Sequence, residues 1–184
     1  MSRFERSGDL DDVKDAATLR QESLDLLDKE DFNRIWVLMN LANVYHIRFR
    51  QTYDSEDLEK AISQYRETLL LCPPDHERKD KLLENLAFSL TSCLENFGRM
   101  GCLEAISLYR AALRLCPRAH PRRQLSLRGL AHAMHARYLW THTIEDLKES
   151  IDPEREDLAL TPPGHPMRPQ MLYNLSIGLY TQYT

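Results

Sequence analysis

A pattern of apolar residues recurs along this chain at steps of 44 or 45 residues, and it constrains the fold more than any other feature. A leucine followed by a small residue occurs four times, as Leu41-Ala42, Leu86-Ala87, Leu130-Ala131 and Leu175-Ser176. Asparagine precedes the first, second and fourth of these pairs, and Gly129 precedes Leu130-Ala131. A regular step of this length indicates a chain of stacked structural units, because one such unit is too small to bury its own apolar face.

A second part of the repeat ends at a proline. Residues 61–66 (AISQYR) return 44 positions later as residues 105–110 (AISLYR). Three prolines close the copies, and a histidine follows each by three residues: Pro73 and His76, Pro117 and His120, Pro162 and His165. Proline has no amide hydrogen and disfavours helix in the residue before it, so these positions predict helix ends.

Both parts of the repeat have the apolar spacing of amphipathic helices. In the first part, positions i, i+3, i+4 and i+7 are Leu38, Leu41, Ala42 and Tyr45. We therefore expect each unit to be a hairpin of two antiparallel helices, called helix A and helix B here. The expected fold class is all-α, and the 6 glycines of the chain are few for a turn-rich β protein.

The same residues resemble the tetratricopeptide repeat (TPR) family, in a long form of 44–45 residues. The TPR helix A has a large apolar residue, a leucine, a small residue and a large one, like Leu38, Leu41, Ala42 and Tyr45. The TPR helix B has a small residue, an aromatic, a small residue and a proline, like Ala61, Tyr65, Thr68 and Pro73, and like Ala105, Tyr109, Ala112 and Pro117. The chain is similar to the repeats of kinesin light chains and still more to arrays in fungal signalling proteins that carry a CHAT domain. This resemblance implies an α-α superhelix of right-handed twist.

We expect one repeat array over residues 1–184. It would comprise the tail of a helix A and a helix B over 1–30, repeats over 31–76 and 77–120, a degenerate repeat over 121–165 and a lone helix A over 166–184. In the degenerate repeat Pro153 falls inside helix B, which predicts a kink or break near 151–153. Neither end shows a polar capping element, so we expect a segment of a longer array or a chain that caps itself by association.

The TPR resemblance implies that the A helices line a concave groove for an extended peptide or a partner helix. The candidate groove residues are Asn43, Asn85, Phe88, Arg128, His132, Tyr173 and Tyr180, and the same helix faces carry Met39, His46, Glu84, Thr91, His135 and Ile177. Carboxamides both donate and accept hydrogen bonds, which suits a peptide backbone. The alternative is that the asparagines bond only within their own hairpins. A clamp for a terminal carboxylate is not expected, because Met39, Leu125 and Gly129 stand where the family has basic residues.

The charges are unevenly distributed. The net charge is −4, which gives no global attraction to nucleic acid or to an anionic membrane. Residues 105–144 contain seven arginines and no acid, and an acidic stretch follows over 145–157. This pattern indicates either a solvated face balanced by neighbouring acids or a docking patch for an acidic segment.

No metal, cofactor or catalytic site is expected. His132 and His135 share a helix face, but no third or fourth ligand has a diagnostic spacing. The four cysteines form no C-x-x-C pair, and the N-terminus lacks the apolar stretch of a signal peptide, so we expect free thiols and a cytoplasmic protein. No apolar run is long enough to span a membrane.

The predicted function is protein–protein interaction. The partner would be a protein or a peptide, and an acidic partner is one option. The alternative is a structural or self-associating segment of a larger signalling protein, with no ligand of its own. An enzyme is not expected, since no catalytic motif is present.

Overall fold

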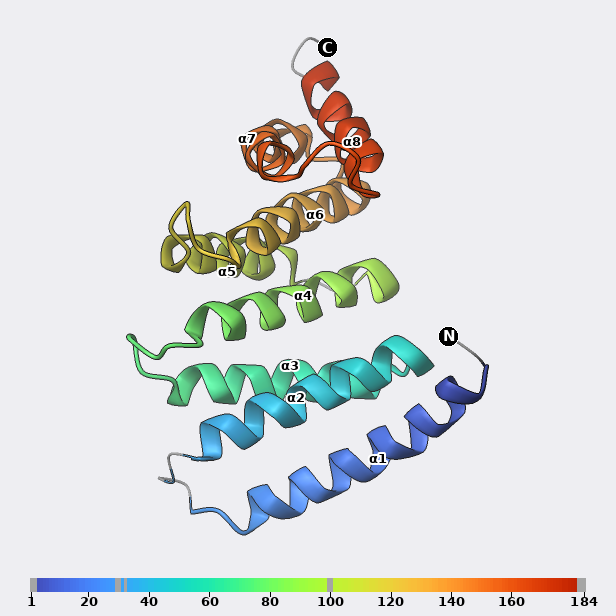
Figure 1. The fold of residues 1–184 in the computed structure, drawn as a ribbon, viewed down its shortest axis with the longest axis vertical. Helices are drawn as coiled ribbons and strands as arrows, with labels where there is room; N and C mark the ends of the chain where they lie inside the picture. Colours follow the sequence, from blue (N-terminus) through green and yellow to red (C-terminus); the bar gives the residue numbers. More distant parts are fainter. Residues whose placement is uncertain (1–2, 29–30, 32, 99–100, 182–184) are drawn as a thin grey trace. The chain divides into compact units, whose positions relative to one another are not determined.

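The computed structural model describes residues 3–28, 31, 33–98 and 101–181, and these residues form α-helices and no strand (Figure 1). The helices are α1 (Arg3–Asp25), α2 (Asn33–Thr52), α3 (Ser55–Leu71), α4 (Lys79–Phe97), α5 (Cys102–Leu115), α6 (Arg123–Thr141), α7 (Ile144–Leu160) and α8 (Arg168–Thr181). The predicted all-α class is confirmed. The right-handed superhelical course and the TPR assignment stay predictions.

The chain divides into two compact units, Met1–Ser89 and Leu90–Thr184, with the boundary inside α4. In the first unit α2 packs against both α1 and α3. In the second unit α6 packs against α5 and α7, and α7 packs against α8. Within each unit, helices that follow one another along the chain are neighbours in space, which is how hairpin repeats bury their apolar faces.

The core of the first unit is built from the repeat positions. Leu38 and Leu41 of α2 are fully buried and pack with Ala17 and Leu24 of α1. The helix B signature of α3 faces inward as well, and its buried members are Ala61, Tyr65 and Thr68. Burial of a leucine side chain contributes about 1.5–3 kcal/mol, so these positions dominate the stability of the hairpin.

In the second unit a glycine allows two helices to approach closely. Gly129 of α6 stands where the other copies of the repeat have asparagine. A Cβ atom at this position would lie 2.3 Å from the ring of Tyr109 on α5. The buried aromatic of the helix B signature therefore occupies the space that an asparagine side chain would need.

The Pro-x-x-His loops form the same turn three times. The backbone N–H of each histidine donates to the proline carbonyl, at 3.2 Å for His76, 2.8 Å for His120 and 3.3 Å for His165. The Nδ1 atom of each histidine then accepts the N–H two residues further on, at 3.2, 3.3 and 3.2 Å. The recurring histidine thus satisfies a backbone donor that the start of the next helix A leaves free.

A basic residue three positions after each histidine completes this loop. The side chains of Lys79, Arg123 and Arg168 donate to backbone carbonyls at the end of the preceding helix B. The acceptors are Pro73, Cys116 and Thr161, and the Arg123 bond measures 2.7 Å. A cation at a helix C-terminus also interacts favourably with the helix dipole. Each loop therefore caps the helix before it and the helix after it.

Two expectations are corrected by the structure. The break predicted near 151–153 is wrong, because α7 runs without interruption from Ile144 to Leu160 with Pro153 inside it. The buried residues Ile151, Glu154 and Asp157 hold both sides of the proline against the rest of the unit, and this packing outweighs the lost hydrogen bond. In place of a helix A tail and a separate helix B, residues 3–25 form the single helix α1, which contains no proline that would stop it.

Candidate functional site

The two candidate asparagines of the first unit are bonded to each other. The Oδ1 atom of Asn43 on α2 accepts from Nδ2 of Asn85 on α4 and from the hydroxyl of Tyr65 on α3, both at 2.8 Å. Tyr65 is buried, and burial raises its pKa above the ordinary value. The asparagine carbonyl oxygen therefore serves to join three helices, as the alternative interpretation of the asparagines anticipated in part. Both asparagines nevertheless stay partly exposed.

Phe88 is the exposed aromatic of this region. Its ring lies 5.0 Å from the ring of His46, and 39% of its surface is accessible. His46 itself is buried, with Nδ1 at 2.8 Å from Oγ of Ser89. Ser89 donates its own proton to the carbonyl of Asn85, so His46 donates from Nδ1 and its buried Nε2 lacks a hydrogen-bond partner. Burial, with the nearby charge of Arg50, lowers the pKa of His46 to about 4.

Four further predicted groove positions on α2 and α4 have buried side chains. Met39, His46, Glu84 and Thr91 are buried between helices. The prediction that these side chains lie open in a groove is wrong, because at most 7% of each is accessible. Of the predicted groove residues in the first unit, Asn43, Asn85 and Phe88 are accessible.

In the second unit the candidate side chains of α6 are used in ion pairs. Arg128 donates to Asp157 of α7 at 3.2 and 3.4 Å. His132 lies 2.7 Å from a carboxylate oxygen of Glu95, and the hydrogen bond to this carboxylate raises the pKa of His132. Both α6 side chains are partly exposed, and both are already positioned by carboxylates of the same unit.

The two candidate tyrosines of α8 are the most accessible of the predicted set. Tyr173 is 62% exposed and Tyr180 is 71% exposed, and Leu172 beside them is 49% exposed. On the side that faces α7, Gly178 is buried: a Cβ atom there would lie 2.9 Å from the backbone oxygen of Leu147. The helix therefore contacts its neighbour closely at one point and presents large apolar side chains elsewhere.

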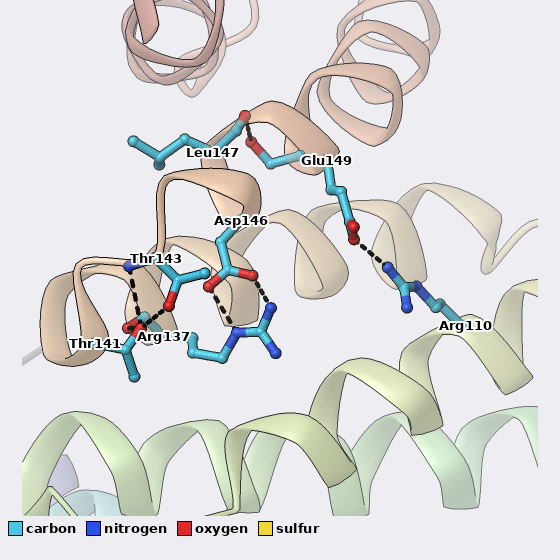
Figure 2. A network of polar contacts seen from close by, with 8 residues as sticks. Arg110, Arg137, Thr141, Thr143, Asp146, Leu147 and Glu149 are labelled. Atoms are coloured by element: carbon cyan, nitrogen blue, oxygen red, sulfur yellow. Dashed lines mark hydrogen bonds and ion pairs between the residues drawn. The ribbon is translucent and has the colours of Figure 1, made fainter. Parts of the chain in front are cut away.

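A row of polar contacts that join α7 to α6 and α5, some of them buried, was not predicted from the sequence (Figure 2). Asp146 is fully buried and receives two hydrogen bonds from Arg137, and Glu149 pairs with Arg110 of α5. Further along the same two helices lie His135 with Glu154, Arg128 with Asp157, Gln124 with Thr161 and Arg123 with Glu156. Four of the seven arginines in this stretch thus pair with acids of α7.

Two of these ion pairs have equivalents in the hairpin of α2 and α3, at positions 89 residues earlier in the sequence. Arg48 donates to the buried carboxylate of Asp57 at 2.6 Å, and Arg34 donates to Glu67 at 3.2 Å. These pairs have the same sequence spacing as Arg137 with Asp146 and Arg123 with Glu156. At the corresponding positions the middle hairpin has Cys93 with Gly101 and Lys79 with Ala111, which cannot form them. A comparison of alternate repeats would have found this signal.

Comparison with known proteins leaves the family open. No protein-family model matches the chain, and no curated protein shows significant similarity to it. Within the described residues, no helix has the length and apolar character needed to cross a membrane.

Proposed function

We propose that this chain is a protein-interaction module of TPR-like helix hairpins, which binds an extended peptide or a partner helix along its A helices. The observation that carries the proposal is an exposed aromatic, Phe88, one helical turn beyond the partly exposed pair Asn43 and Asn85. An aromatic anchor beside amides that can bond a peptide backbone is the usual chemistry of an interaction hot spot. Tyr173 and Tyr180 offer comparable anchors on the second unit.

The test is the affinity of a partner for chain variants. A partner identified by affinity purification is titrated against the wild-type chain and against Phe88→Ala. We expect at least a tenfold loss of affinity, about 1.4 kcal/mol, with unchanged helical content. Leu26→Ala, which removes an 87% exposed side chain after α1, is the matched control and should leave binding unchanged. Equal losses in both variants, or none in either, would contradict the proposal. Arg128 is unsuitable for this test because it neutralises the buried carboxylate of Asp157.

The second candidate function is a structural or self-associating segment, and the exposed side chains of α8 favour it. Leu172, Tyr173 and Tyr180 each expose a large apolar side chain on this one helix, and exposed apolar side chains in number mark protein contacts. Size-exclusion chromatography with light scattering separates the two candidates. A self-associating segment runs above the monomer mass of 21.5 kDa, and Tyr180→Lys should return it to the monomer.

The proposal also places the protein in the cytoplasm, with a protein or peptide partner and without nucleic acid, a membrane or a cofactor. Three of the cysteines, Cys72, Cys93 and Cys116, carry free thiols, and burial raises the pKa of the Cys72 thiol. Free thiols suit a reducing compartment. No catalytic step is part of the proposal.

A further inference from the structure

A cleft of about 540 Å³ lies in the first unit, between the start of α2 and the loop that follows α3. Its apolar lining consists of Ile35, Trp36, Met39 and Pro73, and its polar lining of Asn33, Asp75, His76, Glu77 and Arg78. A volume of this size, with apolar walls and a few polar groups, falls in the range of 300–1,000 Å³ that is typical of ligand sites.

Trp36 is the accessible aromatic of the cleft. It is 48% exposed, although it lies in the first turn of a helix whose inner face is buried. The guanidinium of Arg78 lies over its ring at 4.5 Å from the ring centroid and also contacts the carboxylate of Glu77 at 3.3 Å. Arg78 is thereby held against the ring, and the buried side chain of Met39 lies one turn further along α2. An apolar side chain entering the cleft would meet the indole of Trp36 and the thioether of Met39.

The charge of the lining favours a basic partner. The Nδ1 atom of His76 accepts the backbone N–H of Arg78. Asp75 and Glu77 are exposed acids, and Arg78 is the cation among the lining residues, which leaves two negative charges against one positive charge. Glu77 forms an ion pair with Arg78, whereas Asp75 forms no ion pair with any residue that the structure describes. A cation placed at Asp75 would gain an attraction that an anion would not.

We propose that this cleft anchors a short extended segment of a partner protein, in which an apolar side chain enters between Trp36 and Met39 and a neighbouring lysine or arginine pairs with Asp75. This inference rests on the proposed function and names the partner's chemistry. Met39 precedes Asn43 by one helical turn on α2, so a segment anchored in the cleft could continue toward Asn43 and Phe88. In the second unit α7 already engages Arg110, Arg123, Arg128 and Arg137, so these four arginines are less accessible to an acidic partner.

The test uses three fluorescent peptides, titrated against the full chain by anisotropy at low ionic strength. The first alternates leucine with lysine, the second has glutamate in place of lysine, and the third has serine in place of leucine. We expect the first peptide to bind at least tenfold more tightly than either of the others. Trp36→Ala should weaken its binding about tenfold, and Asp75→Lys should remove the preference for lysine over glutamate.

Matched variants separate this site from general effects of charge and folding. Trp140→Ala removes the other tryptophan of the chain, and Asp152→Lys reverses an exposed acid of the second unit. Neither should change the titration. Equal binding of the lysine and glutamate peptides, no binding of any peptide, or equal effects of Trp36→Ala and Trp140→Ala would overturn the inference. The proposed function is judged separately by its natural partner and Phe88→Ala, so it can stand where the cleft fails.

Discussion

At the scale of single residues, the helices α2, α4 and α6 end in the same backbone conformation, which glycine adopts in one copy and other residues in two. The residue after α2, α4 and α6 has a left-handed backbone in every case, with φ of 58° at Tyr53, 61° at Gly98 and 54° at His142. Glycine adopts this conformation without strain, whereas other residues are disfavoured there by about 1–2 kcal/mol. At Gly98 a second constraint applies, because a Cβ atom would lie 2.9 Å from the ring of Trp140.

Opposite substitutions at equivalent positions should therefore have opposite effects. We expect His142→Gly to raise the free energy of unfolding by about 0.5–1 kcal/mol, after allowance for the greater freedom of glycine in the unfolded chain. We expect Gly98→Ala to lower it by more than about 1 kcal/mol, since strain and the Trp140 contact act together. Urea unfolding followed by circular dichroism measures both. A destabilising His142→Gly or a neutral Gly98→Ala would show that these caps do not limit stability.

At the scale of helices, the contacts between α6 and α7 combine exposed and buried ion pairs of very different value. Arg110 and Glu149 are both about half exposed, and such a pair contributes at most about 1 kcal/mol. Asp146 is fully buried, so removal of its partner Arg137 leaves a buried charge without compensation.

We expect Arg137→Met to lower the free energy of unfolding by about 3 kcal/mol and Arg110→Met to lower it by less than about 1 kcal/mol. The double variant Arg137→Met with Asp146→Leu should recover most of the loss, and a urea double-mutant cycle tests this directly. Additive losses would mean that Asp146 is not the buried charge at issue.

The same helices show what the sequence could and could not predict. The hairpins follow from the sequence, because Leu38, Leu41 and their repeats set the buried face and the prolines end each helix B. The continuity of α7 through Pro153 did not follow, since it depends on tertiary packing of Ile151 and Asp157, which no local pattern contains. Arg128 was predicted as a groove residue from its place on the helix face. Its ion pair with Asp157, 29 residues away, could not be predicted, because helical periodicity carries no information on such distant contacts. Asn43 and Asn85 were both predicted as groove residues of the A helices, but their hydrogen bond was not predicted, because they are 42 residues apart and the repeat pairs Asn85 with Asn40.

At the scale of the whole molecule, the chain alternates between two kinds of hairpin. The hairpins α2–α3 and α6–α7 contain ion pairs at equivalent positions, one set in each compact unit. The middle hairpin has Cys93 and Gly101 at those positions, and the boundary between the units falls inside its first helix. Stability should therefore be a property of each unit rather than of the chain as one body.

Acidification should reveal this division, because the two units contain histidines shifted in opposite directions. In the first unit, burial and Arg50 hold the pKa of His46 at about 4, below its ordinary 6.5, so the unfolded chain binds the proton first as the pH falls. The contribution of His46 is complete above pH 6.5 and is lost between pH 6.5 and about 4, with about 2 kcal/mol lost by pH 5. In the second unit, the hydrogen bond to Glu95 raises the pKa of His132 above 6.5. Its contribution is present below that pH and disappears as the pH rises through the raised value.

The 2 tryptophans of the chain report on the units separately, since Trp36 lies in the first unit and Trp140 in the second. Urea unfolding of Trp140→Phe, followed through Trp36, should show a midpoint that falls clearly between pH 7 and pH 5. Trp36→Phe, followed through Trp140, should show a smaller fall or none over the same range. His46→Asn keeps a hydrogen-bond donor toward Ser89 but does not titrate, so it should remove the pH dependence of the first unit alone. Midpoints that move together in both tryptophan variants would mean that the chain unfolds as a single cooperative body.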